Sequence, residues 1–459
     1  MHTTYAPAQG PPQKPGSDPS IDQSLEQRVT DLTQQVAELK SLVQALQKQL
    51  AGGGQVPATQ ASVQTPEKST TALPAEDKAV AAPSSPLPLG FTLNALLDGY
   101  YEYNLNSPVG RVNELRAYDV SSNNFSLNQA DLVIERAPDP EAGQRMGLRV
   151  DLQYGQATST LQGNPVNELR PDVYRNIFQA YGTYVFPLAN GLTVDFGKWA
   201  SSLGIEGNYT KDQLNYSRSF WFNYLPFYHA GLRTKLAISD RWAVNFWVVN
   251  GTDQTEAFNN YKDQMLGFVF TPTAGVIWTA NFYRGQEHPD VLYLASQPGT
   301  GPTLPEQQGT YILPIAHPPT GKLEIADTYL SWQLSDRWLL AAEADAVWQR
   351  YYSYSPQQRA YGGALYLGYQ INREFAMAAR GEYLADVNGL FSGVPQYLKE
   401  ATFTIDYRPV DGFLVRGEFR RDSSDQHYFL SHTLGVLGAA QPTIGIGLVW
   451  WLGQKTGPW

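Results

Sequence analysis

From Phe91 onward, apolar and polar residues alternate with a period of two, in segments of about ten residues. The apolar or small residues of three such segments are Met146, Leu148, Val150, Leu152 and Tyr154, then Ala401, Phe403, Ile405 and Tyr407, then Phe413, Val415, Gly417 and Phe419. Successive side chains of a strand point to opposite faces, so each segment has an apolar and a polar face. The sequence contains no run of 18 or more apolar residues, the length that a helix needs to cross a membrane. A membrane protein with this sequence must therefore close its strands into a barrel.

The connections between the segments alternate in length, as in outer-membrane barrels, which have short periplasmic turns and longer outer loops. Short turns are predicted at 138–144, 187–191, 239–241, 271–275, 335–337, 372–374 and 409–412. Long loops are predicted at 104–123, 156–175, 200–227, 251–263, 285–322, 351–358, 386–396 and 422–441. Strands around these loops and turns number about 16, an even count as bacterial barrels require. A separate strand at 430–437 would change that count by two.

Composition favours the same fold class. Aromatic residues reach 13% and charged residues only 17%, with 28 Tyr and 11 Trp, and membrane barrels place such rings at both membrane interfaces. A soluble propeller is the alternative, but propellers repeat every 40 to 50 residues or so, and no fixed period of that kind is present. We therefore expect an all-β transmembrane fold, an antiparallel outer-membrane β-barrel of about 16 strands over residues 91–459.

The region before the barrel has three parts. Residues 1–20 are rich in Pro, Gly and Gln and are expected to be disordered, whereas residues 21–51 are expected to form an α-helical coiled-coil stalk. The heptad seam of the stalk is Leu25, Val29, Leu32, Val36, Leu39, Val43, Leu46 and Leu50. Val at a and Leu at d favour two strands, Leu42 widens the apolar face and leaves three open, and an amphipathic helix packed elsewhere is the alternative.

Residues 52–90 are rich in Gly, Pro, Ala and Thr and are expected to form a flexible linker. The first 12 residues lack the basic start and apolar core of a signal peptide, so we expect that such a peptide was removed or never cloned. The absence of Cys excludes disulfides and thiolate metal sites and fits an envelope protein. A net charge of -10 without a basic stripe makes nucleic acid an improbable partner.

Charged residues at inward-facing positions are the candidates for lining a pore. They are Arg149, Asp151, Glu343, Asp345, Arg380, Glu382, Arg416, Glu418 and Arg420. Charges on a wet lumen tune which solutes pass, and opposed acidic and basic walls create a transverse field at a constriction. The alternative is that they form salt bridges that stabilise the wall, and one residue can do both.

The segment 201–227 is long, aromatic and mixed in charge. A loop of this kind could fold into the barrel and narrow it, with Glu206 or Asp212 facing the basic wall. Its constriction candidates are Glu206, Lys211, Asp212 and Arg218. The alternative is an outward loop that packs on its neighbours.

No catalytic motif is present in the sequence, which lacks GxSxG, HExxH and a Gly-rich phosphate loop after a strand. His427 and His432 fall in or near the last long loop, where surface histidines are ordinary. With six His and no Cys, a zinc site is improbable. We expect no cofactor, no metal and no enzymatic activity.

Several short motifs in order resemble the OmpL-like β-barrel porins of the beta-barrel porin-2 group, over about residues 91–459. They are Val194-Asp195-Phe196-Gly197-Lys198-Trp199, Leu203-Gly204-Ile205-Glu206, Asn215-Tyr216-Ser217-Arg218-Ser219, His229-Ala230-Gly231-Leu232, Arg408-Pro409, Leu414-Val415-Arg416-Gly417-Glu418-Phe419-Arg420 and Asp422. The resemblance implies an outer-membrane porin. The chain departs from many barrels because Gly457-Pro458 interrupt the last strand before Trp459, the candidate terminal aromatic. The stalk lies outside the resemblance and is similar to periplasmic segments by which some porins reach toward the cell wall.

These patterns together predict a bacterial outer-membrane porin, a passive diffusion channel for small hydrophilic solutes or ions, with its N-terminal segment in the periplasm. Its expected partners are membrane lipid, lipopolysaccharide and further copies of the chain in a dimer or trimer, with peptidoglycan as a partner of the stalk. The first alternative is a structural tether in which a narrow or plugged barrel anchors the membrane. The second, an outer-membrane enzyme, has no site in the sequence to support it.

Overall fold

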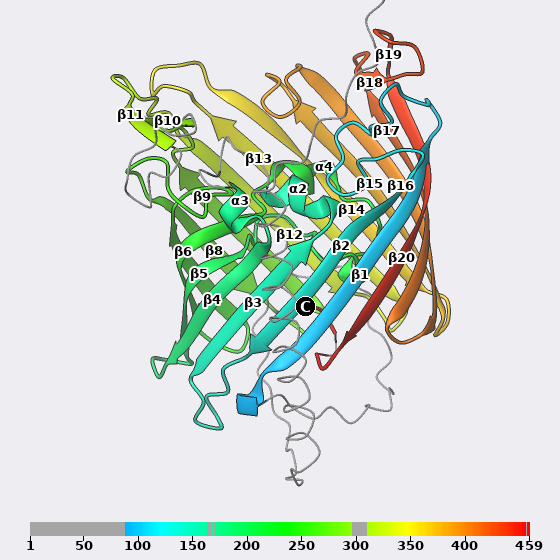
Figure 1. Ribbon diagram of the computed structural model, residues 1–459. Helices are drawn as coiled ribbons and strands as arrows, with labels where there is room; N and C mark the ends of the chain where they lie inside the picture. Colours follow the sequence, from blue (N-terminus) through cyan, green and yellow to red (C-terminus); the bar gives the residue numbers. More distant parts are fainter. Residues whose placement is uncertain (1–87, 163–167, 169–170, 296–309, 456) are drawn as a thin grey trace, which may run out of the picture. The chain divides into compact units, whose positions relative to one another are not determined.

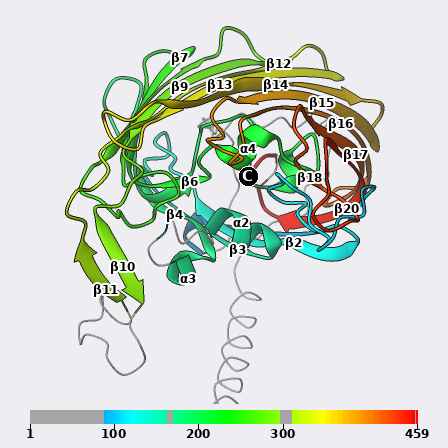
Figure 2. The ribbon, with the colours of Figure 1, turned by 90° about the horizontal axis from the view of Figure 1, so that it is seen from above.

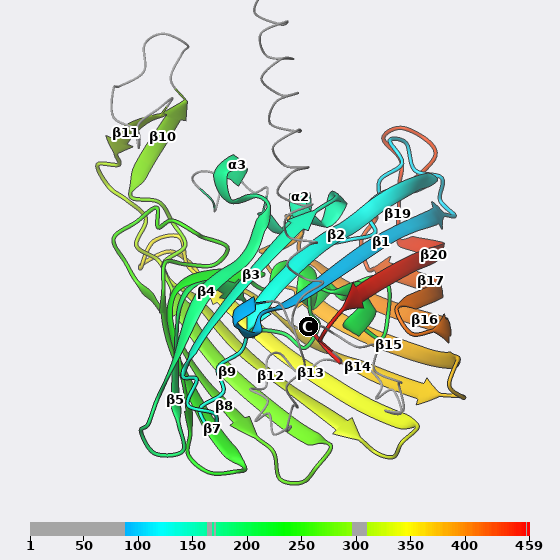
Figure 3. The ribbon, with the colours of Figure 1, turned by 60° about the horizontal axis from the view of Figure 1, so that its bottom comes forward.

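The computed structural model describes residues 88–162, 168, 171–295, 310–455 and 457–459. Within these residues the chain forms a closed antiparallel barrel of 16 strands, in the order β1-β2-β3-β4-β5-β6-β7-β8-β9-β12-β13-β14-β15-β16-β17-β20 (Figure 1). The last strand, β20, pairs with β1, so that Asn94 lies opposite Gly453 and Asn104 opposite Thr443 (Figure 3). Closure leaves the sheet without an unpaired edge. The predicted fold class and strand number are confirmed.

The barrel strands alternate between short and long connections, as predicted. Their bounds are β1 Thr92–Asn104, β2 Asn124–Arg136, β3 Met146–Tyr154, β4 Ile177–Phe186, β5 Leu192–Ala200, β6 Tyr228–Ala237, β7 Trp242–Val249, β8 Asp263–Phe270, β9 Val276–Gly285, β12 Leu323–Gln333, β13 Trp338–Gln349, β14 Gln358–Gln370, β15 Phe375–Asp386, β16 Gln396–Val410, β17 Phe413–Ser424 and β20 Ala440–Gly453. The short turns lie together at one end of the barrel and the long loops at the other (Figure 1).

The long loops carry the remaining elements. Two small hairpins, β10 (Val291–Ala295) with β11 (Thr310–Pro314) and β18 (Phe429–Leu430) with β19 (Leu437–Gly438), lie outside the barrel sheet. The helical segments are η1 (Pro88–Gly90), α2 (Gln156–Gln162), α3 (Pro171–Tyr174), η2 (Thr210–Asp212) and α4 (Phe220–Tyr224). No helix among the described residues has the length and apolar character that crossing a membrane requires. The possible strand at 430–437 is thus a hairpin, which leaves the barrel count unchanged.

Aromatic rings form pairs on the outer face at the short-turn end of the strands. Trp242 stacks on Phe270 with 4.1 Å between ring centroids, and Trp338 lies 4.3 Å from Tyr369. The same end of the sheet holds Phe375 with Tyr407 and Phe413 with Trp450. At the long-loop end, Tyr101 lies against Phe125 and Tyr383 stacks on Tyr397. Two aromatic bands separated by an apolar outer face are the pattern of a barrel that spans a bilayer.

The segment after the last strand turns toward the interior. Trp459 is buried, and its ring lies 5.8 Å from that of Tyr209. Its backbone N–H donates a hydrogen bond to Asp212 Oδ2 at 2.9 Å, and Gly457 O accepts one from Lys211 Nζ. Trp459 therefore does not act as an outward-facing aromatic of β20, because the chain has already left the sheet at Gly453.

The predicted disordered segment 1–20, coiled-coil stalk 21–51 and linker 52–90 lie outside the described residues, except for η1 at the end of the linker. The two-strand, three-strand and packed-helix alternatives for the stalk therefore stay predictions.

Candidate functional site

The segment 201–227, here called the inner loop, joins β5 to β6 and runs through the barrel interior. Seen along the barrel, its helix α4 lies within the ring of strands (Figure 2). None of its residues is exposed. It makes hydrogen bonds to side chains of β1, β2, β3, β9, β12, β13, β15, β16 and β17, so that it reaches opposite walls of the barrel. The outward-packing alternative for this segment does not hold, because its contacts are with inner-face residues.

The inner loop is organised first by its own side chains. Arg218 donates to the carbonyl oxygens of Gly207 at 3.0 Å, Asn208 at 2.9 Å and Tyr216 at 2.7 Å, which joins the two arms of the loop. Ser219 caps α4, since its side chain accepts a hydrogen bond from Phe222 N. These contacts satisfy backbone groups that would otherwise be buried without partners.

Glutamate side chains of the wall accept hydrogen bonds from the loop backbone. Glu382 of β15 accepts from Phe220 N at 2.8 Å and Trp221 N at 2.9 Å, which are the first free amides of α4. A carboxylate at this position satisfies unpaired N–H groups. Glu418 of β17 binds in the same manner to the backbone amides of Tyr216 and Ser217, at 2.6 and 2.9 Å.

The start of the inner loop is held by two further carboxylates. Gly204 N donates to Asp327 Oδ1 and Ile205 N donates to Glu343 Oε1, each at 3.0 Å. Gly204 has φ +79°, and a Cβ there would lie 3.0 Å from Glu343 Oε1 and 3.1 Å from the side chain of Leu225. Glycine is therefore required both by the backbone conformation and by the close approach to the wall.

Arginines of the wall bind the loop through its carbonyl oxygens. Arg416 of β17 donates to the backbone oxygens of Thr210, Gln213 and Asn215 at 2.7 to 3.1 Å, and its other edge pairs with Asp406. The planar, five-donor guanidinium suits this role, which a lysine could not fill.

Arg380 of β15 lies between two acids. Its Nη1 is 2.6 Å from Glu206 Oε1 of the inner loop, and its Nε is 3.0 Å from Glu400 Oε2 of β16. All three side chains are buried. Glu206 also accepts a hydrogen bond from Ser219 N through its other oxygen. This one carboxylate therefore links two parts of the inner loop to each other and to the wall.

On the opposite wall, Arg149 and Asp151 of β3 form an ion pair with 2.9 Å between Nε and Oδ1. The hydroxyl of Tyr209 donates to Asp151. Nearby on the inner loop, Lys211 pairs with Asp212 at 2.7 Å and lies over the ring of Trp459. Lys211, Asp212 and Arg218 are thus engaged within the loop and with the C-terminal segment, whereas Glu206 reaches the wall at Arg380.

All nine pore-lining candidates carry their polar groups on the inner face of the barrel. Glu343, Glu382 and Glu418 contact the inner loop through backbone amides, and Arg380, Arg416 and Arg420 through carbonyl oxygens or Glu206. Asp345 differs, because both of its carboxylate oxygens are buried without a hydrogen-bond partner in the described part of the chain. The salt-bridge interpretation of these residues and the solute-tuning one both stay open, since wall pairs are present and one residue can serve both roles.

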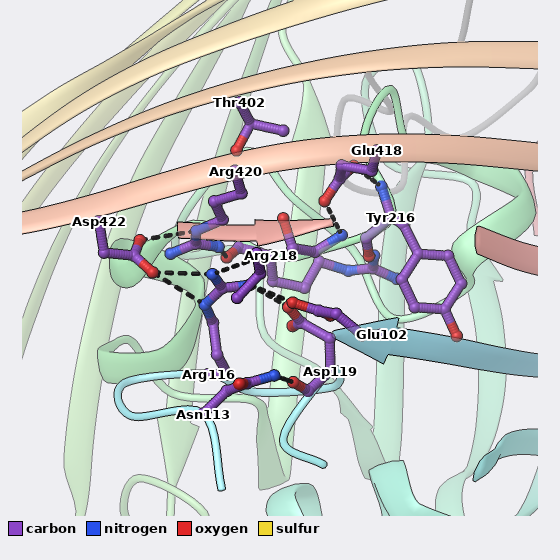
Figure 4. A network of polar contacts seen from close by, with 12 residues as sticks. Glu102, Asn113, Arg116, Asp119, Tyr216, Arg218, Thr402, Glu418, Arg420 and Asp422 are labelled. Atoms are coloured by element: carbon purple, nitrogen blue, oxygen red, sulfur yellow. Dashed lines mark hydrogen bonds and ion pairs between the residues drawn. The ribbon is translucent and has the colours of Figure 1, made fainter. Parts of the chain in front are cut away.

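The first long loop, 105–123, also contributes to the interior, which the sequence pattern did not indicate. Arg116 of this loop reaches Asp422 of β17, with 2.7 Å between Nη2 and Oδ2, and pairs with Asp119 of its own loop (Figure 4). Asp422 also accepts from Arg420 Nε at 2.7 Å, so it bridges two arginines from distant parts of the chain. The guanidinium of Arg218 lies 4.6 Å from the ring of Tyr118, which joins this loop to the inner loop. Loop residues have no strand parity, so no periodic signal could have identified Arg116.

A serine and a histidine also meet in the interior. His229 Nε2 lies 3.1 Å from Ser201 Oγ, and His229 Nδ1 lies 3.0 Å from the carbonyl oxygen of Gly251. Both side chains are fully buried, and the ring lies against Trp247 and Tyr283. The pair has a backbone carbonyl, that of Gly251, where a catalytic serine–histidine pair has a carboxylate. Its geometry is that of a packed polar contact at the start of the inner loop.

The loop after β7 contains an aspartate, Asp253, whose pKa is raised. Asp253 Oδ1 accepts hydrogen bonds from Phe227 N at 2.7 Å and Tyr228 N at 3.1 Å, at the end of the inner loop. Burial raises the pKa of this carboxyl group to about 7, against the lowering effects of those amides and of Lys198. The protonation of Asp253 can therefore change near neutral pH.

A 16-stranded closed barrel with a polar, charged interior and an inner loop tied to its wall is the architecture of a porin. The sequence profile of the family "Putative beta-barrel porin-2, OmpL-like" matches residues 90–450. The chain belongs to this porin family. The match runs from before β1 into β20, so the porin is an outer-membrane protein, and the resemblance inferred from the short motifs is confirmed.

Several solved structures of outer-membrane proteins are similar to this porin. The anion-selective porin from Comamonas acidovorans is 8% identical, with a TM-score of 0.51, over 79% of this chain and 99% of that one. The outer membrane channel DcaP of Acinetobacter baumannii is 10% identical, with a TM-score of 0.48, over 79% and 97%. A loop-deletion form of the outer membrane protein OmpT of Vibrio cholerae is 10% identical, with a TM-score of 0.47, over 79% and 99%. No curated protein matches the chain in sequence.

Proposed function

We propose that this porin is a passive diffusion channel for small hydrophilic solutes or ions, narrowed by the inner loop. The observation that carries the proposal is the set of charged side chains on β13, β15 and β17 that holds a backbone segment inside a closed barrel, namely Glu343, Arg380, Glu382, Arg416 and Glu418. A polar wall around fixed backbone dipoles is suited to solutes that shed part of their hydration, and not to apolar ligands.

The orientation and assembly of the channel belong to the same proposal. The short-turn end, where β1 begins, faces the periplasm as in other outer-membrane barrels, so the N-terminal segment is periplasmic. Because a coiled coil needs more than one helix, the predicted stalk favours a homo-oligomer. Lipid and lipopolysaccharide surround the outer face.

Single-channel recording in a planar bilayer tests the proposal. The full-length protein should give stable current steps that scale with salt concentration, and a salt gradient should give a reversal potential whose sign reports the dominant lumen charge. Correctly folded protein that passes no current would overturn the channel and support the tether, in which the inner loop closes the barrel. The enzyme alternative gains no support from the buried Ser201–His229 contact.

A further inference from the structure

Three carboxylates meet on the inner face of two neighbouring strands. Asp327 of β12 lies opposite Asp345 of β13 in the strand pairing, and Glu343 is two residues before Asp345. One oxygen from each of the three lies within 4.8 Å of the others. All are buried, with exposed fractions of 3, 4 and 5% for Asp327, Asp345 and Glu343. Like charges directly opposite each other on paired strands repel, and burial strengthens that repulsion.

The hydrogen bonds around the cluster satisfy two of the three acids and leave one unmet. Glu343 accepts from Ile205 N and from the hydroxyl of Tyr366, and Asp327 accepts from Gly204 N and from Asn281 Nδ2 at 2.7 Å. Both oxygens of Asp345 are buried and accept no hydrogen bond from an N–H or O–H donor of the described residues, and the polar group that they meet is the carboxyl group of Asp327. No ion pair joins Glu343 or Asp345 to a basic side chain in the part of the chain that the structure describes.

The surroundings add further negative charge to the cluster. Glu206 and Glu382 lie within electrostatic reach of Glu343. Arg380 of β15, a basic residue of this part of the wall, pairs with Glu206 and Glu400. A buried, unmet carboxylate beside two others is costly unless a positive charge or protons neutralise it.

We propose that Asp327, Glu343 and Asp345 form a binding site for a divalent cation, and that the cation is calcium. All three donors are carboxylate oxygens, the ligands that calcium prefers and that it accepts in variable number and geometry. Zinc favours nitrogen and sulfur ligands, and magnesium retains several waters, for which a buried cluster is poorly suited.

The site would act on the inner loop. The amides of Gly204 and Ile205 already donate to Asp327 and Glu343, so a cation held by the same acids orients the anchor of the loop without displacing it. Bound calcium therefore ties the start of the inner loop to β12 and β13. This inference concerns binding and stability, and it stands whether or not the barrel conducts.

Direct binding to the full-length protein tests the site. Protein refolded without lipopolysaccharide, stripped with EDTA and held in detergent at pH 7.5 is titrated with CaCl2 in a calorimeter, then with MgCl2. We expect one calcium per chain, weaker magnesium binding and a higher thermal midpoint with calcium. Asp345→Asn should weaken calcium binding by about tenfold or more, and Glu343→Gln, a second variant, should do the same.

The matched control is Asp131→Asn. Asp131 of β2 is also buried with both oxygens unpartnered, but it is not one of the three clustered acids. This variant should keep the affinity of the wild type. Absence of calcium binding in the wild type, or equal affinity in Asp345→Asn, would overturn the site and indicate that the acids share protons instead. Calcium binding by a protein that passes no current would leave the site standing and reject the channel, and current without calcium binding would do the reverse.

Discussion

Arg380 Nη1 lies 2.6 Å from Glu206 Oε1, which joins the barrel wall to the inner loop by an ion pair shielded from solvent. The residues are 174 positions apart in the chain. The same guanidinium binds Glu400 of the neighbouring strand, and it donates to the backbone oxygen of Ser217 at 2.9 Å. One side chain thus fixes both the position of the loop and the charge balance of this wall.

Replacement of Arg380 by Met should destabilise the barrel strongly. The change leaves Glu206 and Glu400 buried without their cation, and breaking a buried pair in this manner costs about 3 to 5 kcal/mol. Urea unfolding in lipid vesicles, followed by tryptophan fluorescence, measures the loss. The control is Arg284→Met, because Arg284 pairs with Glu324 at an exposed position, where an ion pair contributes about 0 to 1 kcal/mol. Equal losses in the two variants would contradict the role of Arg380.

Shortening the inner loop should widen the channel. If residues 203–224 are replaced by a short Gly-Ser linker, the segment that reaches opposite walls is removed, and single-channel conductance should rise by about twofold or more. Deletion of the β10–β11 hairpin, residues 291–314, is the control, since that hairpin pairs outside the barrel sheet. Unchanged conductance in the inner-loop variant would show that the loop does not limit the current.

Asp253 should make stability fall as the pH rises through the neutral range. Its pKa in the folded protein is about 7, above the ordinary 3.8, so the folded state binds more protons than the unfolded state between these values. Stability then decreases as pH increases across that window. Asp253→Asn retains an oxygen for the amides of Phe227 and Tyr228, and Asn tolerates the positive φ of 53° at this position.

Thermal midpoints measured from pH 4 to pH 8 test this. The Asp253→Asn variant should show a shallower decline than the wild type. An identical slope in both proteins would mean that Asp253 does not titrate in this range. Asp290→Asn, which alters another loop carboxylate, one that accepts from Asn260 N, serves as the control.

Trp459 should hold the segment after β20 inside the barrel. Its ring packs on Tyr209 and under Lys211, and its backbone amide donates to Asp212. Trp459→Ala removes this apolar and cation–π contact, so amide hydrogen exchange over residues 454–459 should speed up by about tenfold or more. The control, Leu452→Ala, changes a side chain that is 75% exposed on the outer face and should leave that exchange unchanged.

The strands of the barrel could be predicted because their signal is local. Arg416 and Glu418 fall at inward positions because they alternate with Val415, Gly417 and Phe419, which face outward. The period of two holds along most of the barrel strands, with register shifts in a few pairings. The same rule could have identified Asp327, which lies between the inward residues Ile325 and Tyr329, but an acid in an apolar strand was not singled out there. Gly and Pro marked four of the short connections, whereas the turns at 239–241, 335–337 and 372–374 have only Ser-Asp-Arg or Asn-Arg-Glu.

The sequence by itself determined the fold class, the strand number and the inner face of each strand. It also determined that the inner loop is one of the long connections. Only the tertiary structure decided that Glu206 meets Arg380, that Arg116 of the first loop meets Asp422, and that Asp345 is left without a hydrogen-bond partner. The physical reason is that strand periodicity is a property of neighbouring residues, whereas contacts across a lumen join residues whose spacing in the chain carries no repeat. Their geometry exists only once β20 has closed on β1 and the loops have been confined inside.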